Sequence, residues 1–174
     1  EHNPVIIHGG PFANIAHGCS SVIATTTCLK YSDYCITEAG FGSDLGALKF
    51  YDIKCRANNL NPAATVLVTT IKALKYNGHD NLSEGISNLK AHINILKNMT
   101  ENIVVCLNKF DNDTKSDITF VKKYCEEQNV KFAVSTAYKD GGKGAIELAK
   151  VVLDTMKETK YHELYSLDIN LKDK

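Results

Sequence analysis

The chain has 174 residues, of which 20 are basic and 20 are acidic, so its formal net charge is zero. This balance gives no electrostatic reason to expect nucleic acid or an anionic membrane as a partner. No apolar run approaches the length of a membrane span, and a chain of this length can bury enough surface for one core.

The first predicted unit is a buried strand at Pro4–Ile7 followed by a glycine-rich turn, residues 8–18, and apolar positions up to Leu29 that suit a helix. Two adjacent glycines without Cβ atoms and the free N–H groups at a helix start favour an anion in such a corner. An ordinary tight turn with solvated histidines is the alternative. The candidate residues here are His8, Asn14 and His17, which carry polar side chains, with Gly9 and Gly10.

The same order of strand, glycine-rich turn and helix recurs at Tyr34–Thr37 and residues 38–46. This turn carries two carboxylates, which can bind Mg²⁺ through water or orient a cationic group. We expect Asp44 to cap the helix that follows, whereas the role of Glu38 stays open. A helix is then predicted at residues 49–57.

Strands and helices continue to alternate along the rest of the chain. Residues 103–107 show no polar alternation, as expected for a strand that is covered on both faces. A helix that begins near Thr114 and Asp117 has a capping-box pattern, and Ser83 is the expected cap of the helix before it. The other predicted elements are strands at 63–69 and 131–134 and a helix at 144–156.

These repeated units predict an α/β fold with a mostly parallel sheet and helices on both faces. Ligands of such sheets bind beyond the carboxyl ends of the strands. We therefore expect the residues at the five predicted strand ends to gather at one edge of the sheet. They are His8, Glu38, Thr70, Asn108 and Ser135.

Three features at these strand ends suggest binding chemistry. Lys72 can hold phosphate or carboxylate, with a solvated helix lysine as the alternative. The string 108–111, Asn-Lys-Phe-Asp, fits the Asn-Lys-x-Asp motif of GTP-binding proteins, so the C-terminal half of such a protein is the alternative function. Phe110 and Tyr138 lie just past strands, where two aromatic faces suit a planar ligand, although aromatic residues at the rim of the core would look the same.

Six cysteines lie singly along the chain, without a Cys-x-x-Cys pair or zinc spacing to a histidine, so no metal site is predicted. Buried free thiols are favoured over a disulfide framework, which indicates a reducing compartment, the cytoplasm. Because the first residues include neither an initiating Met nor a signal-peptide pattern, we expect residues 1–174 to be a single α/β segment from the central part of a longer chain.

Both glycine-rich motifs, together with residues 68–78 (Val-Thr-Thr-Ile-Lys-Ala-Leu-Lys-Tyr-Asn-Gly), resemble formate–tetrahydrofolate ligases from Pro4 to about Ala149. Thr69, Lys72 and His79 depart from the family's usual pattern, in which Arg takes the place of Lys72. The resemblance implies a ligase fold similar to that of P-loop NTPases. It also implies a function in one-carbon metabolism, the ATP-dependent joining of formate to tetrahydrofolate through formyl phosphate, with 10-formyltetrahydrofolate, ADP and phosphate as products.

The resemblance further implies a folate ring held between Phe110 and Tyr138, where the family has Trp at the second position. It implies ATP with Mg²⁺, formate, tetrahydrofolate and the remainder of the parent chain as partners, and it is compatible with a homo-oligomer. A Gly-x-x-x-x-Gly-Lys-Ser/Thr loop does not occur here, and the family has it upstream, so we expect these residues alone to be inactive. The implied catalytic residues are His8, Asn14, His17 and Glu38, and the implied phosphate- or nucleotide-binding residues are Gly9, Gly10, Lys72, Val134 and Ser135.

Overall fold

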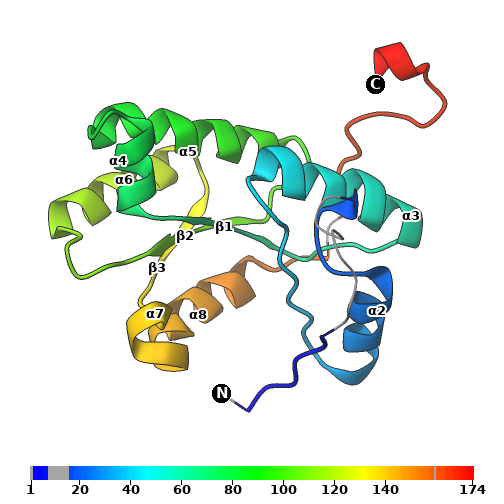
Figure 1. Ribbon diagram of the computed structural model, residues 1–174, viewed down its shortest axis with the longest axis horizontal. Helices are drawn as coiled ribbons and strands as arrows, with labels where there is room; N and C mark the ends of the chain where they lie inside the picture. The colour runs from blue at the N-terminus through cyan, green and yellow to red at the C-terminus, as the bar shows by residue number, and fades with distance from the viewer. Residues whose placement is uncertain (1, 8–15, 159) are drawn as a thin grey trace. The chain divides into compact units, whose positions relative to one another are not determined.

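The computed structural model describes residues 2–7, 16–158 and 160–174, which form two compact units (Figure 1). Unit 1 comprises residues 62–158, and unit 2 comprises residues 2–7, 16–61 and 160–174. No helix among these described residues is both long and apolar enough to cross a bilayer. The expectation that residues 1–174 are a single segment of a longer chain stays a prediction.

Unit 1 is built on a parallel sheet of three strands in the order β1 (Thr65–Thr69), β2 (Ile103–Asn108) and β3 (Lys131–Ser135). All three strands were predicted. Residues 103–107 of β2 are fully buried, as the absence of polar alternation indicated. In β1, by contrast, Val66 and Val68 are 38% and 56% exposed and the other three residues are half-buried, so this strand is less buried than its apolar sequence predicts.

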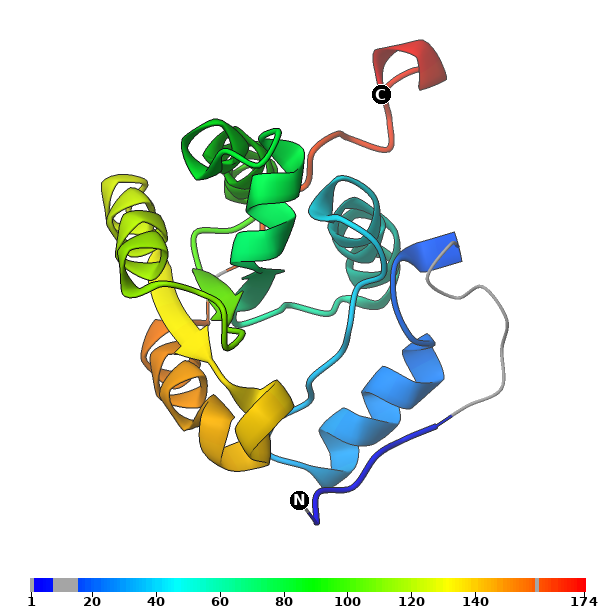
Figure 2. The same ribbon diagram turned by 60° about the vertical axis from the view of Figure 1, so that its left-hand side comes forward.

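Helices cover both faces of this sheet, which confirms the predicted α/β arrangement. On one face α5 (Leu82–Lys97) packs on β1 and β2, and α6 (Lys115–Glu127) packs on β3. On the other face α8 (Ile146–Thr155) packs on β2 and β3, so that β3 lies between α6 and α8 (Figure 2). The remaining helical elements of the unit are α4 (Ile71–Asn77), α7 (Ala137–Asp140) and the 3₁₀ turn η3 (Gly141–Ala145).

Side-chain caps fix where the helices of unit 1 begin. Thr114 caps α6, since its hydroxyl accepts a hydrogen bond from the N–H of Asp117 at 3.1 Å, as predicted. The expected cap at Ser83 is wrong by two residues. Asn81 begins α5, and its side-chain oxygen accepts hydrogen bonds from both the N–H and the hydroxyl of Ser83, at 2.9 and 2.7 Å.

Unit 2 is helical where strands were expected. Within the described part of the chain, residues 4–7 and 34–37 are extended but join no sheet, and Ile7 and Ile36 are 87% and 95% exposed. The two predicted strands are therefore wrong, because an apolar extended segment becomes a strand only where another strand satisfies its backbone groups. The helical elements described in this unit include α2 (Val22–Tyr31), the π-helical turns η1 (Ser43–Ala47) and η2 (Phe50–Cys55), α3 (Arg56–Asn58) and the 3₁₀ turn η4 (Leu171–Asp173).

The predicted helix at residues 49–57 is present in unit 2 as η2 and α3, with π-helical bonding over most of its length. Asp44 lies inside η1, and Gly42 precedes that turn with no side-chain cap, so the predicted Asp44 cap is wrong. Arg56 fastens the C-terminal segment to this helix. Its guanidinium donates to Asp52 at 2.9 Å and to the carbonyl of Tyr165 at 2.8 Å, and it lies 4.6 Å from the Tyr165 ring.

We expect Leu107→Ala in β2 to lower the free energy of unfolding by about 2–5 kcal/mol, because the side chain is completely buried and its removal leaves a cavity. Leu153→Ala in α8 is the matched control. That side chain is 50% exposed, so the same change should cost less than about 1 kcal/mol. Urea unfolding followed by circular dichroism measures both, and equal losses would contradict the burial of β2 as the source of stability.

Candidate functional site

The carboxyl ends of the three strands form one edge of the unit 1 sheet, where Thr70, Asn108 and Ser135 follow or end them as predicted. The expectation that Glu38 also follows a strand at this edge is wrong, because residues 34–37 join no sheet, and His8 lies outside the described residues.

Asn108 and Ser135 are paired in the parallel register of β2 and β3. Backbone hydrogen bonds then fix the start of the segments that follow β2 and β3. The N–H of Lys109 donates to the carbonyl of Ser135 at 2.9 Å, and the N–H of Thr136 donates to the carbonyl of Gly144 at 3.0 Å. The edge is therefore a fixed platform for the two segments that follow β2 and β3.

Phe110 and Tyr138 lie side by side at this edge. Their ring centroids are 5.8 Å apart and their planes are inclined by 49°. Phe110 is 42% exposed and Tyr138 is 89% exposed, so neither is a core residue. Asp113 holds the backbone of the first ring, because its carboxylate accepts a hydrogen bond from the N–H of Phe110 at 2.8 Å. The structure thus brings together the two aromatic residues that sequence reasoning singled out.

An ion pair joins the same two segments beside the rings. Lys139 Nζ lies 2.8 Å from Asp111 Oδ1. The hydrogen bond and charge of Lys139 lower the pKa of the Asp111 carboxyl, and the same contact raises the pKa of Lys139. If residues 108–111 were the Asn-Lys-x-Asp motif of a GTP-binding protein, the Asp111 carboxylate would bind guanine. In the structure, one of its oxygens already accepts a hydrogen bond from Lys139.

The candidate phosphate-binding residues of unit 1 differ in their surroundings. Lys72 is exposed in the first turn of α4, whereas Lys75, one turn later, donates to Asp117 of α6 at 2.8 Å. Val134 is half-buried within β3. Ser135 is buried, and its hydroxyl accepts a hydrogen bond from the N–H of Ala137 at 3.3 Å.

In unit 2 the chain segments that carry His17 and Glu38 run antiparallel beside one another. Cys19 and Ala39 form an isolated bridge, the N–H of Gly40 donates to the carbonyl of Gly18 at 2.7 Å, and the hydroxyls of Ser20 and Thr37 are 3.1 Å apart. His17 is half-buried and Glu38 is exposed. The other candidates of the first glycine-rich turn, His8, Gly9, Gly10 and Asn14, lie outside the described residues.

The glycines at the ends of the two motifs allow backbone to pack on backbone. Gly18 has a φ of +90°, which L side chains rarely adopt. A Cβ on Gly18 would overlap the carbonyl oxygen of Gly46, and a Cβ on Gly46 would overlap the carbonyl oxygen of Gly40. These glycines therefore allow the two motifs to pack closely together. The repeated order of strand, turn and helix in the sequence did not indicate this structural role.

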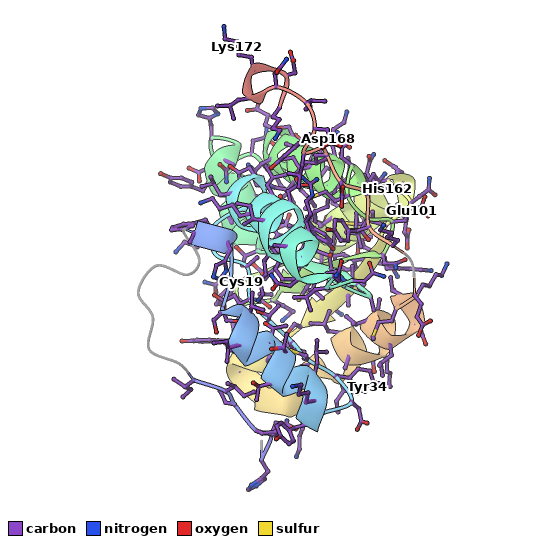
Figure 3. The ribbon with its side chains drawn as sticks, turned by 90° about the vertical axis from the view of Figure 1, so that its right-hand side faces the viewer. Cys19, Tyr34, Glu101, His162, Asp168 and Lys172 are labelled. Carbon is purple, nitrogen blue, oxygen red and sulfur yellow. The ribbon has the colours of Figure 1, made fainter. Side chains whose placement is uncertain are left out.

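Sequence reasoning missed Lys54, which organises this part of unit 2. The side chain is 1% exposed, and its Nζ donates to Cys19 Sγ at 3.0 Å, to the carbonyl of Ser20 at 2.8 Å and to Thr25 Oγ1 at 2.7 Å. Cys19 lies just before the start of α2 (Figure 3). The sequence signal that could have identified Lys54 is its position among apolar residues of the predicted helix, between Tyr51 and Cys55. Both of these residues are buried in the structure, and Lys54 lies on the same inner face of η2.

Comparison with known proteins gives one consistent result. The family described as formate–tetrahydrofolate ligase matches residues 1–174, the whole chain. The chain is also similar to a formate–tetrahydrofolate ligase from Campylobacter concisus (strain 13826), with 51% identity over 187 aligned positions. That alignment covers 100% of this chain and 34% of the relative, so the chain spans about a third of the length of the curated relative it matches.

We expect Asp117→Asn to destabilise unit 1 at neutral pH by up to about 1 kcal/mol, because it removes the partly exposed pair with Lys75. The hydrogen bond from Lys75 lowers the pKa of Asp117 below its ordinary value of 3.8. The stabilisation is therefore complete above that value and is lost as the pH falls through the lower, folded-state pKa.

Urea unfolding of the wild type and of Asp117→Asn between pH 7 and the acid limit of folding measures this difference. The difference in the free energy of unfolding between the wild type and Asp117→Asn should decrease in acid. It should also be small at pH 7 when both proteins carry Lys75→Met. A difference that is independent of pH would contradict the assignment to the ion pair.

Proposed function

This chain belongs to the formate–tetrahydrofolate ligase family, and from that premise we propose that the protein containing it joins formate to tetrahydrofolate with the consumption of ATP. The products of the proposed reaction are 10-formyltetrahydrofolate, ADP and phosphate, with formyl phosphate as the intermediate. The proposal extends to a ligase fold similar to that of P-loop NTPases, which the parallel sheet with helices on both faces supports.

The observation that carries the proposal is the contact between Phe110 and Tyr138 at the carboxyl edge of the sheet. A planar heterocycle buries both of its faces when two aromatic rings enclose it, and aromatic side chains lose little conformational entropy in doing so. We propose that these two residues enclose the flat ring of the folate. The alternative function, guanine nucleotide binding through residues 108–111, finds no support in the comparisons.

Binding between the rings requires them to separate. A ring stacked between two others needs contacts of about 3.5 Å on each side, hence about 7 Å between parallel planes. The observed centroid distance of 5.8 Å and inclination of 49° leave no such space. Tyr138 is the side chain that we expect to turn outward, because it is 89% exposed and lies on the short helix α7.

We propose, for each unit separately, a role of its candidate residues in phosphate chemistry. In unit 2, the half-buried His17 and the exposed Glu38 lie on adjacent antiparallel segments, which supports a role for both motifs. The paired register of Asn108 and Ser135 supports a nucleotide-facing role for the end of β3. The full proposed set is His8, Asn14, His17 and Glu38 as catalytic residues, with Gly9, Gly10, Lys72, Val134 and Ser135 binding phosphate or nucleotide.

Fixed donors and cations in such a site stabilise the charge that develops during phosphoryl and acyl transfer. Lys72 is exposed enough to reach an anionic ligand, and it would act as a point charge. The described residues contain no group of three or more acidic, histidine or cysteine side chains that could hold a metal ion. We propose that Mg²⁺ binds together with the phosphates of ATP. We propose the cytoplasm as the compartment, which the six free thiols support.

Phe110→Ala and Tyr138→Ala in the full-length natural protein should each weaken tetrahydrofolate binding by roughly 1–3 kcal/mol through lost stacking and burial. ATP binding should change little. Tyr138→Trp should keep or tighten folate binding, because the larger ring offers more stacking area. Isothermal titration calorimetry with each ligand measures these effects.

Phe120→Ala is the matched control for both alanine variants. Phe120 lies on α6 and is 40% exposed, close to the exposure of Phe110, but it lies outside the aromatic pair. It should leave folate affinity unchanged. Equal loss of folate and ATP affinity in Phe110→Ala would assign that residue a structural role and overturn the proposed clamp.

The reaction itself is tested by the formate-dependent release of ADP in the presence of tetrahydrofolate and MgATP. The full-length natural protein should turn over, and the 174-residue chain alone should not, because its sequence contains no Gly-x-x-x-x-Gly-Lys-Ser/Thr loop to grip the nucleotide phosphates. Turnover by the short chain at the rate of the full-length protein would refute the second expectation. Absence of formate-dependent turnover in the folded full-length protein would refute the proposed function.

A further inference from the structure

The end of α2 carries two neighbouring cysteines that the proposed reaction does not use. Cys28 lies in the last turn of the helix, and Cys35 follows in the extended segment. The two thiols lie close enough for each to shift the pKa of the other. This end of α2, where Tyr34 is labelled, is the end away from Cys19 (Figure 3).

Ser32 stabilises the turn of the chain between the two cysteines. Its hydroxyl donates to the carbonyl of Cys28 at 2.7 Å, lies 3.3 Å from Cys28 Sγ and lies 3.0 Å from the carbonyl of Tyr34. Cys35 Sγ then lies 3.8 Å from the carbonyl oxygen of Thr25. Thr25 is three residues before Cys28 and so on the same side of the helix, which places Cys35 beside Cys28.

These two cysteines also differ from the other four in accessibility. Both are partly exposed, whereas the others, Cys19, Cys55, Cys106 and Cys125, are buried. Burial raises the pKa of Cys106 to about 11 and those of Cys55 and Cys125 to about 12, which keeps them as unreactive thiols.

We propose that Cys28 and Cys35 form a reversible disulfide when the protein meets a hydroperoxide. Cys28 is the attacking residue, because the neighbouring Ser32 hydroxyl, which lies 3.3 Å from its sulfur, and the Cys35 thiol lower its pKa and favour the thiolate. Cys35 is the resolving residue, with a pKa raised to about 11 by burial and by the neighbouring Cys28.

The oxidation proceeds in two steps. The Cys28 thiolate attacks one oxygen of hydrogen peroxide, so that an S–O bond forms, the O–O bond breaks and the departing hydroxide takes a proton to become water. The sulfur of Cys35 then attacks the sulfur of the Cys28 sulfenic acid, which forms the S–S bond, breaks the S–O bond and releases a second water with the Cys35 proton. The two thiols lose two electrons and the peroxide gains them. The new bond ties the last turn of α2 to the segment that leads to Glu38.

The test treats the full-length natural protein with limiting hydrogen peroxide, alkylates the remaining thiols and measures the intact mass and the peptide map. We expect a mass loss of two hydrogen atoms, two fewer alkylatable thiols, a cross-linked peptide that joins positions 28 and 35, and full reversal by dithiothreitol. Oxidation without that cross-link, or a cross-link between other cysteines, would overturn the proposal. This measurement needs no variant, so it does not depend on how a substitution folds.

Two variants separate the roles of the thiols. Cys35→Ser should stop at the Cys28 sulfenic acid, which dimedone traps, and Cys28→Ser should lose both the cross-link and the rapid phase of oxidation. Cys106→Ala removes a buried thiol of unit 1 and should leave the cross-link unchanged. Dimedone labelling at position 35 of Cys28→Ser at the wild-type rate would overturn the assignment of Cys28 as the attacking residue.

Discussion

The parallel pairing of β2 with a strand on either side is the constraint on which unit 1 depends. A parallel strand satisfies its backbone groups only through its neighbours, and its buried side chains need cover on both faces. The five residues 103–107 meet this demand with uninterrupted apolar side chains between α5 and α8. Because parallel strands end at the same edge, the pairing of Asn108 with Ser135 follows, and with it the positions of Phe110 and Tyr138.

Unit 2 is held together by other interactions, because the described part of it contains no sheet. Backbone packs directly on backbone where Gly18 meets Gly46, and the buried Lys54 amino group joins the end of the first glycine-rich motif to α2. A buried lysine is tolerated only when its donors are satisfied, and here three acceptors surround it. The glycine-rich motifs therefore have a packing role in addition to any role in anion binding.

The two units contribute different chemistry to the proposed ligase. Unit 1 offers a flat, partly exposed aromatic pair on a fixed sheet edge, which suits a planar ligand. Unit 2 offers half-buried His17, a neighbouring carboxylate segment and a region of dense polar contacts around Lys54. Cys35 contacts the carbonyl oxygen of Thr25, and the hydroxyl of the same Thr25 accepts from Lys54, so the proposed disulfide adjoins that region although the proposed reaction does not use the two thiols.

The sequence by itself determined the features that depend on local interactions or on strong apolar patterns. Uninterrupted hydrophobicity predicted β2, the Thr114 hydroxyl predicted the start of α6, and the placement of Phe110 and Tyr138 just past strands identified the aromatic pair. The family resemblance rested on ungapped motifs, which the match over the whole chain confirmed.

Tertiary structure decided the features that require a partner distant in the sequence. Residues 34–37 have a strand-like composition, but strand formation needs a neighbour, so the chain leaves them extended. Lys54 looks like any helical lysine until Cys19, Ser20 and Thr25 supply its acceptors from some 30 positions earlier. The 5.8 Å between the two aromatic rings likewise comes from strand register, which pairs segments by backbone hydrogen bonds that no local pattern encodes.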